Sequence, residues 1–181
     1  MPNNFIQNSD GKNSVLRQAI IAKFVKEGSD SIADISREIG VSIPTVTKLV
    51  GELIDEGIIE EIGKLGTSGG RRPSIYGLNP RAGYFVGVEV RAHHISMAIT
   101  DFKGEICDYQ EDIPFAVEKT EASFKALCDF LKDSIGKAGF DRSKILAYGF
   151  NFSGRVNSET GYCFSYFISE GRTVCDILKD E

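Results

Sequence analysis

Five residues at the start of one predicted helix could contact nucleic acid. They are Ser42, Pro44, Thr45, Thr47 and Lys48. Hydroxyl groups and a lysine in the first turns of a helix suit hydrogen bonds to base edges and to phosphates. Two short helices could equally form an ordinary helical hairpin, so the segment that follows has to decide between the two interpretations.

A glycine-rich loop with basic residues follows that helix. Two predicted strands, Ile58–Ile62 and Ser74–Leu78, enclose the segment from Gly63 to Pro73, and strands with a glycine-rich connection are typical of a hairpin. Its basic residues are Lys64, Arg71 and Arg72. Arginines at the exit of such a loop suit a narrow minor groove, where the negative potential is concentrated. A solvated tether to the next domain is the alternative.

Three predicted helices position these residues. The first runs from the cap Ser14 to Glu27 and ends at Gly28, the second starts with a capping box of Ser31 and Asp34 and ends at Gly40, and the third starts at the cap Ser42. Apolar residues at helical spacing predict the buried faces: Leu16, Ala19, Ile20, Phe24 and Val25; Ile32, Ile35 and Ile39; Val46, Leu49, Val50, Leu53 and Ile54. Helices and hairpin together predict a winged helix-turn-helix DNA-binding domain over residues 1–80.

The composition limits the kind of nucleic-acid contact. The chain has 181 residues and a formal net charge of −5. A non-specific coat needs many cations on one surface, so an acidic chain favours a sequence-specific site with a small basic cluster. Lys48, Lys64, Arg71 and Arg72 could form that cluster.

Neither a targeting segment nor a metal site is predicted. The first residues lack a signal-peptide pattern, and no window approaches the roughly 20 apolar residues of a membrane span, which predicts a soluble cytoplasmic protein. The four cysteines lack ligand spacing and are expected to be reduced, buried thiols. They are Cys107, Cys128, Cys163 and Cys175. The adjacent His93 and His94 would point to opposite faces of a strand, which argues against a shared metal ion.

Residues 81–181 have a different pattern. Strands are predicted over Tyr84–Val90, Ile95–Thr100, Glu105–Gln110 and Ile145–Phe150, with a helix over Thr120–Lys137 before the last of them. The first three strands should form an antiparallel meander. The order βββαβ is that of the first part of a ribonuclease-H-like or actin-like ATPase fold. The expected fold class is therefore α/β, or α+β for the whole chain.

The joining of these two domains resembles the ROK family of repressors, open reading frames and kinases. The motifs that carry the resemblance are Gly69-Gly-Arg-Arg-Pro73, Tyr76-Gly-Leu-Asn79, Gly87-Val-Glu-Val90 and the turn Asp101-Phe-Lys-Gly104. The resemblance implies a winged helix that binds double-stranded operator DNA and a kinase-like domain that senses a sugar or sugar phosphate. It predicts a repressor of carbohydrate-utilisation genes.

The kinase chemistry of that family is not expected here. Family kinases carry Asp-x-Gly-Gly-Thr after the first strand, where the glycines approach ATP phosphates. The aligned residues are Glu89 to His93, so both glycines and the threonine are missing. Phosphoryl transfer depends on positioning and electrostatics, so no enzyme activity and no cofactor are predicted.

The sugar pocket of the family is expected to be represented only by its first loop. Gly154 and Asn157 are candidate effector-binding residues, and Gly161 matches the glycine that closes the following hairpin; an ordinary turn is the alternative for all three. The family's later sugar and zinc motifs do not occur before Glu181. The chain is therefore expected to be either part of a protein about twice as long or a complete chain that dimerises by unusual means, through an exposed sheet edge.

Two other functions fit parts of the pattern. An ROK-type sugar kinase with an added helical domain would turn over ATP, and that activity would depend on Glu89. A protein-interaction module would use the winged helix to bind a partner, and Arg71 and Arg72 would then be dispensable. DNA binding by a homodimer is the expectation that uses most of the sequence features.

Overall fold

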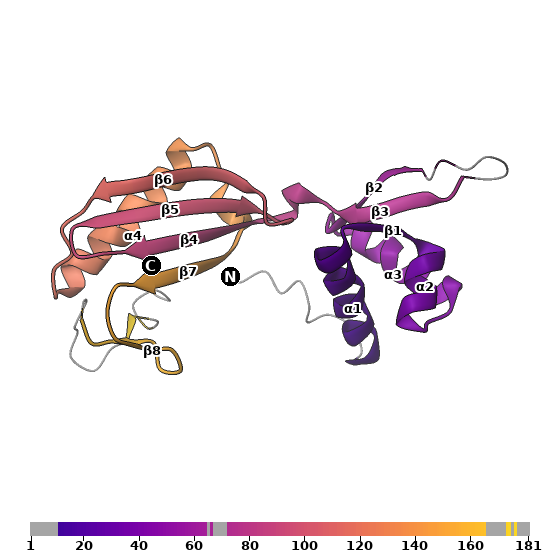
Figure 1. Cartoon of the computed structure of the whole chain (residues 1–181), viewed down its shortest axis with the longest axis horizontal. Helices are drawn as coiled ribbons and strands as arrows, with labels where there is room; N and C mark the ends of the chain where they lie inside the picture. Colours follow the sequence, from indigo (N-terminus) through magenta and orange to yellow (C-terminus); the bar gives the residue numbers. More distant parts are fainter. Residues whose placement is uncertain (1–10, 65, 67–71, 166–172, 175, 177–181) are drawn as a thin grey trace. The chain divides into compact units, whose positions relative to one another are not determined.

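The structure is a computed structural model, which describes residues 11–64, 66, 72–165, 173–174 and 176 (Figure 1). It divides into two units. One comprises Met1–Gly83 with Asp101–Glu105, and the other comprises Tyr84–Thr100 with Ile106–Glu181. Each unit has a buried apolar core of its own.

Three helices form most of the first unit: α1 (Gly11–Glu27), α2 (Ile32–Ile39) and α3 (Ile43–Asp55). The two predicted glycine stops are confirmed, since Gly28 has φ +88° and Gly40 has φ +71°, a left-handed conformation that glycine adopts without a Cβ clash. The predicted cap of α1 is wrong, because Ser14 lies inside the helix, which already begins at Gly11.

The two predicted N-caps differ in their chemistry. Ser31 caps α2, since its Oγ accepts a hydrogen bond from the backbone N of Asp34 at 3.2 Å. The capping box is only half formed, because the backbone N of Ser31 donates to Asp30 Oδ1 at 2.8 Å and not to Asp34. Ser42 occupies the N-cap position of α3 without a side-chain cap bond. Its hydroxyl lies 2.9 Å from the Thr45 hydroxyl instead.

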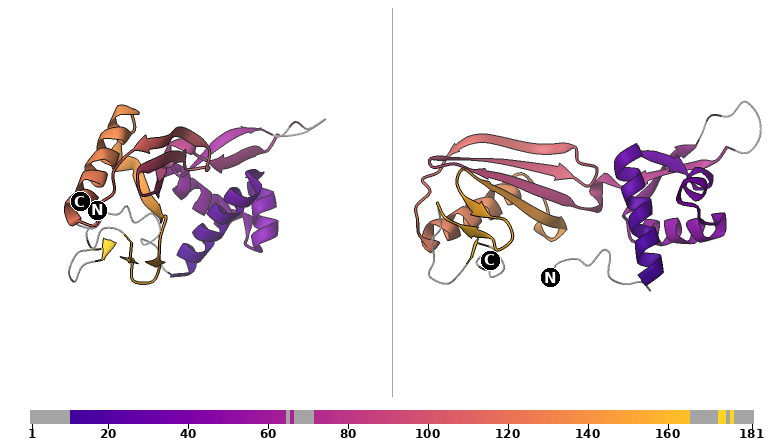
Figure 2. Two further views of the ribbon diagram at one scale, coloured as in Figure 1. Left: turned by 60° about the vertical axis from the view of Figure 1, so that its left-hand side comes forward. Right: turned by 60° about the horizontal axis from the view of Figure 1, so that its bottom comes forward.

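A three-stranded antiparallel sheet completes the first unit. Its strands are β1 (Ser29–Ser31), β2 (Ile59–Lys64) and β3 (Ser74–Leu78), in the order β1-β3-β2. The helices gather on one side of the β2–β3 hairpin (Figure 2). The short 3-10 helix Pro80–Ala82 follows β3. The hairpin is the expected wing, whereas β1 has too few and too polar residues to be predicted.

The core of the first unit contains most of the expected residues. Those buried in the helices are Ile20, Phe24, Ile35, Val46, Leu49, Val50 and Leu53. Two expectations are wrong: Val25 is 68% exposed and Ile54 is 37% exposed, because both lie at the margin of their helix's apolar stripe. Phe102, from the segment Asp101–Glu105, packs against this core.

A four-stranded sheet forms the centre of the second unit. It consists of β4 (Tyr84–Val90), β5 (His94–Asp101), β6 (Ile106–Pro114) and β7 (Ile145–Phe152), in the order β6-β5-β4-β7. β5 and β6 pair antiparallel, whereas β4 and β7 pair parallel. With α4 (Glu121–Lys137) before β7, the order βββαβ is confirmed. The remaining elements are the 3-10 helix Arg142–Lys144, β8 (Val156–Asn157) and β9 (Tyr162–Cys163).

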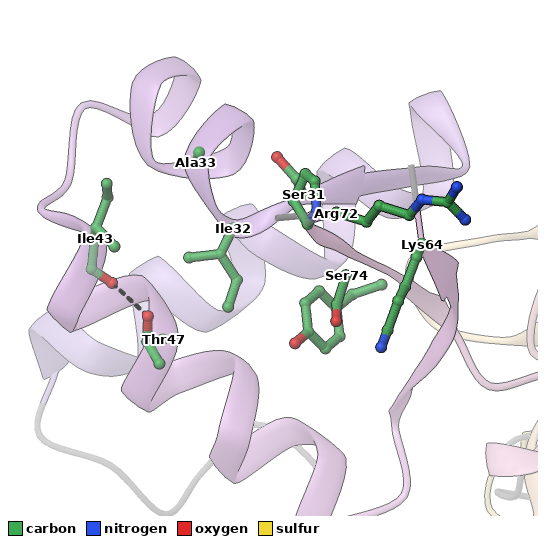
Figure 3. Close-up of a pocket in the computed structure, with 10 residues that line it drawn as sticks. Ser31, Ile32, Ala33, Ile43, Thr47, Lys64, Arg72 and Ser74 are labelled. Atoms are coloured by element: carbon green, nitrogen blue, oxygen red, sulfur yellow. Dashed lines mark hydrogen bonds between the residues drawn. The ribbon is translucent and has the colours of Figure 1, made fainter. Parts of the chain in front are cut away.

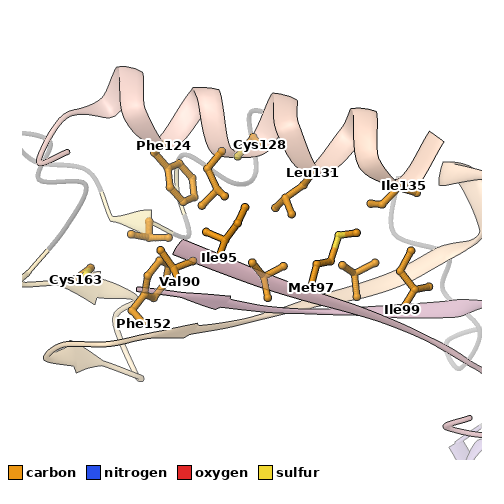
Figure 4. Close-up of a cluster of buried hydrophobic side chains, with 14 residues drawn as sticks. Val90, Ile95, Met97, Ile99, Phe124, Cys128, Leu131, Ile135, Phe152 and Cys163 are labelled. Carbon is orange, nitrogen blue, oxygen red and sulfur yellow. The ribbon is translucent and has the colours of Figure 1, made fainter. Parts of the chain in front are cut away.

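Helix α4 covers one face of this sheet (Figure 4). Its buried residues Phe124, Leu127, Cys128, Leu131 and Ile135 face alternate residues of β4 and β5. On the opposite face Phe85 and Tyr109 are exposed by 39% and 55%. A shallow hollow of about 440 Å³ crosses that face beside Gly87 and Gly149.

The cysteine expectation is only partly correct. Cys128 and Cys163 are buried, but Cys107 is exposed, because it stands on the side of β6 that does not face the core. Cys175 lies outside the described residues. None of the described helices is long and apolar enough to span a membrane.

Candidate nucleic-acid interface

A groove of about 870 Å³ lies between the start of α3, the end of β2 and the start of β3 (Figure 3). Helical residues line one side and hairpin residues line the other. The lining residues are Ser31, Ile32, Ala33, Ile43, Thr47, Lys64, Arg72, Pro73, Ser74 and Tyr76. The tight turn after Gly40 and the short α2 bring the first turn of α3 to this position.

The groove brings together three of the predicted DNA-binding residues: Thr47, Lys64 and Arg72. The other residues of the helix start lie beside it: Ser42, Pro44 and Lys48 are exposed and Thr45 is half-buried. Arg71 lies outside the described residues, as do Gly69 and Gly70. No measurement tests a DNA contact of any of the eight, so each stays a prediction.

The hydroxyl groups of this surface are already engaged within the protein. Thr47 Oγ1 donates to the backbone oxygen of Ile43 at 2.8 Å, and the Ser42 and Thr45 hydroxyls share the contact described above. Each hydroxyl has one donor and can still accept. The helix therefore presents fewer hydroxyl donors to a ligand than its sequence indicates.

The basic groups differ in their partners. Lys48 Nζ lies 3.7 Å from Glu52 Oε1, in an exposed i,i+4 pair, and such pairs are weak enough for a phosphate to replace. In the described part of the chain no acidic side chain pairs with Lys64 or Arg72. Arg17, on α1, pairs with Glu52 and Glu56, and the Glu56 hydrogen bond raises its pKa. Lys64 and Arg72 are thus the two cations of the groove that have no acidic partner among the described residues.

An acidic cluster in the same unit has a structural cation. Lys23 is 7% exposed, and its Nζ lies 2.6 Å from Glu27 Oε2, 3.0 Å from Asp30 Oδ2 and in contact with Glu38. Hydrogen bonding to Glu27 first, then to Glu38, raises the pKa of Lys23. The three carboxylates could hold a metal ion by their spacing, but the ammonium group already lies among them.

The loop aligned with the kinase phosphate site is closed by its own side chains. Arg91 Nη2 lies 2.7 Å from Glu89 Oε2, and Nη1 lies 3.5 Å from Asp112 Oδ1. The backbone N of Arg91 also donates to His94 O at 2.9 Å, which tightens the turn between β4 and β5. His93, on this turn, and His94, the first residue of β5, are both exposed. The guanidinium group of Arg91 is therefore paired with Glu89, the residue aligned with the aspartate that helps to place magnesium in the kinase motif.

The two candidate effector residues lie in and near a small hairpin. Asn157 Oδ1 accepts hydrogen bonds from the backbone N of Glu159 at 3.0 Å and of Thr160 at 3.1 Å. Gly161, with φ +71°, closes the turn by donating to Asn157 O at 2.8 Å. Gly154 lies in the bend before β8. These contacts explain the turn, and a sugar contact of Gly154 or Asn157 stays a prediction.

Sequence reasoning missed the apolar part of the groove. Ile43 stands three residues before Val46, a spacing that predicts burial, yet it is 54% exposed because it lies in the first turn, beyond the edge of the core. Ala33 and Tyr76 also line the groove. Because Ala33 and Tyr76 lie far from Ile43 along the chain, no sequence pattern indicates that the three residues come together.

Fold and groove together define the class: a winged helix followed by a ribonuclease-H-like βββαβ unit. Residues 18–60 match the family described as winged helix-turn-helix DNA-binding. A crystal structure of a ROK family transcriptional regulator, described as a homolog of the E. coli MLC protein, superposes with a TM-score of 0.64 over 87% of this chain and 40% of its own, at 20% identity.

Two relatives add sequence similarity. The xylose repressor of Caldicellulosiruptor bescii is 30% identical over 128 residues, which cover 70% of this chain and 32% of that protein. The xylose repressor of Bacillus subtilis (strain 168) is 35% identical over 92 residues, which cover 51% of this chain and 24% of that protein. The chain thus spans about a third or less of these relatives' length. The resemblance to the ROK family that the residues indicate is confirmed.

Proposed function

We propose that this chain is the DNA-binding part of a transcriptional repressor of sugar-utilisation genes. The observation that carries the proposal is the groove in which the first turn of α3 faces Lys64 and Arg72. Its setting in a winged helix, and the similarity to two xylose repressors, support the same function. A protein that acts on chromosomal DNA in this way would work in the cytoplasm.

The proposed mode of binding places α3 in the major groove. Ser42, Pro44, Thr45 and Thr47 would face base edges, and Lys48 would exchange its Glu52 pair for a phosphate. Lys64, Arg71 and Arg72 would hold the adjacent backbone or minor groove, as the wing of such a domain does. The acidic net charge outside this surface would disfavour non-specific binding.

Selection from random duplexes with the full chain tests the proposal. We expect one enriched sequence, with an affinity that falls as salt is raised because bound phosphates release counterions. An inverted repeat in that sequence, and a complex with two chains per duplex, would support the proposed homodimer. If no sequence is enriched, the repressor proposal is wrong.

Paired variants test the role of the groove cations. Lys64→Ala with Arg72→Ala should weaken operator binding about tenfold or more and reduce the salt slope by about 2, since two phosphate contacts are lost. Lys137→Ala with Arg81→Ala is the matched control, because both residues are exposed and neither lines the groove. An equal loss in both double variants would indicate a general charge effect and count against the groove.

We further propose that residues 81–181 begin a domain that senses a sugar or sugar phosphate. Because two relatives are named xylose repressors, a pentose is the first effector to test. Its addition to the protein–operator complex should weaken DNA binding, and Asn157→Ala should reduce that response if Asn157 contacts the sugar. A response that is unchanged in Asn157→Ala would remove this residue from the effector site.

The alternatives predict other results. We propose that the second unit does not transfer phosphate, because Arg91 replaces the first glycine of the kinase motif and pairs with Glu89. ATP turnover that is lost in Glu89→Ala would favour the kinase. In a protein-interaction module Arg71→Ala with Arg72→Ala would leave every activity intact.

A further inference from the structure

Two methyl-bearing side chains, those of Ile43 and Thr47, stand at the helical side of the groove, and the position of Ile43 was not expected. Ile43 is 54% exposed at the first residue of α3. Thr47, one turn later, is also exposed. A single exposed isoleucine is ordinary, but this one lies on the surface that is proposed to meet DNA.

The hydrogen bond of Thr47 decides which end of its side chain faces outward. Its Oγ1 donates to Ile43 O at 2.8 Å, drawn as the dashed line in Figure 3. A threonine has one hydroxyl hydrogen, so this donor is used within the helix. The methyl group is the other heavy atom on Cβ. Thr47 and Ile43 therefore present two neighbouring apolar groups at the surface.

Other donors on this surface are scarce in the same way. The Ser42 and Thr45 hydroxyls lie 2.9 Å apart, and one of their two hydrogens is used between them. Ala33, on α2, adds a further methyl group to the groove. In the described residues the cations Lys64 and Arg72 lie across the groove from Ile43 and Thr47 (Figure 3). They would fix the register on phosphates without reading bases.

Among the groups exposed in the major groove, the C5-methyl of thymine is the apolar one, and apolar side chains recognise it by contact. We propose that Ile43 and Thr47 read thymine C5-methyl groups in the operator. The proposal rests on the proposed function, and it names the chemistry by which that function selects its sequence.

Replacement of thymine by deoxyuridine tests the proposal, because it removes the methyl group and keeps every hydrogen bond of the base. With the full chain and the duplex from the selection, each thymine is replaced in turn. We expect one or two positions at which affinity falls about threefold to fivefold, the effect of one buried methyl group. Specific binding that is equal for thymine and deoxyuridine at every position overturns this inference and leaves the repressor proposal standing.

Two variants of Thr47 separate its methyl group from its hydroxyl. Thr47→Ser removes the methyl and Thr47→Val removes the hydroxyl. The measured quantity is the ratio of affinities for the thymine and deoxyuridine duplexes. It should fall towards one in Thr47→Ser and in Ile43→Ala, and it should persist in Thr47→Val, whatever the affinity itself does. The reverse result for the two Thr47 variants would make the hydroxyl the reader and overturn the proposal.

A matched control uses another exposed apolar residue. Val15→Ala, on α1, removes methyl groups from a side chain that is 63% exposed and does not line the groove. It should leave both the affinity and the ratio unchanged. Thermal unfolding of each variant shows whether the fold is intact; since all three positions are exposed, we expect transitions close to that of the parent chain. Absence of any sequence-specific binding would overturn this inference together with the repressor proposal.

Discussion

The two units differ in how the described residues enclose apolar surface. In the first, helices and hairpin surround a core in which Ile35 and Leu53 are fully buried. In the second, α4 buries one face of the sheet, while Phe85 and Tyr109 remain exposed on the other. In the described residues, the core of the first unit thus lies below its candidate site, whereas the core of the second lies mainly between α4 and one face of the sheet.

The same contrast holds at the two candidate sites. The groove of the first unit is formed where elements start and end, and its cations have no acidic partner among the described residues. The turn between β4 and β5 has the opposite character, because Arg91 is held by Glu89 and Asp112. Among the described residues, the groove cations lack an acidic partner, whereas the charges at the turn pair with one another.

The largest expected effect separates the two cores. Leu53→Ala should destabilise the first unit by about 2–5 kcal/mol, because it leaves a cavity in a closed core. Leu127→Ala is the matched change in the second unit, where the residue is equally buried. Thermal unfolding followed by calorimetry should show two transitions, with each variant lowering one of them. A single transition that both variants lower equally would mean that the two cores unfold together.

The sequence predicted the parts of the fold that have a regular pattern. α2 and α4 follow apolar residues at helical spacing, and Gly28 and Gly40 end helices because a left-handed conformation is needed there. β1 was missed because three polar residues form a strand only through pairing with β3. β6 continues past Gln110 because a bulge opposite Ser96 accommodates Asp112 at φ +50°.

The sequence predicted the basic residues of the candidate site but not the apolar residues that line the groove. Lys64 and Arg72 were recognisable because a glycine-rich loop presents its basic residues. The groove itself depends on Ala33 and Tyr76, which tertiary folding brings to Ile43. The hydrogen bond from Thr47 Oγ1 to Ile43 O could not be predicted either, because the sequence does not show whether a threonine hydroxyl in a helix donates to the backbone.

A smaller effect is expected from the cation within the first unit. Lys23→Met should lower the free energy of unfolding by about 1–2 kcal/mol at neutral pH, since its three carboxylate partners are partly exposed and such pairs are each worth at most about 1 kcal/mol. Lys26→Met is the control, because Lys26 is an exposed lysine on the same helix. Chemical denaturation of both variants at pH 7 measures the difference.

The pH dependence of the same variant gives an independent test. Hydrogen bonding to Lys23 holds the pKa of Glu27 below its ordinary value of 4.5. A lowered folded pKa contributes stability that is present above pH 4.5 and is lost as the pH falls through the folded value. The parent chain should therefore lose more stability than Lys23→Met on acidification, and the two should converge. A constant difference at all pH values would show that Lys23 acts through packing alone.

The smallest effect on stability is expected at the turn between β4 and β5. Arg91→Gly removes a side chain that is half-exposed and paired with exposed or half-exposed acids, so the unfolding midpoint should move less than in the Leu53→Ala and Lys23→Met variants.

The same variant also places a glycine at the position aligned with the first glycine of the kinase motif. Arg91→Gly with Ala92→Gly and His93→Thr returns the remaining aligned residues except the aspartate. An ATP turnover assay with a pentose and hexose panel should detect no activity in either variant, because Glu89 replaces the aspartate and phosphoryl transfer requires a complete set of positioned groups. Turnover in the triple variant would show that the second unit differs from a kinase by its loop alone, and that the contrast between the two units is one of three side chains and not of architecture.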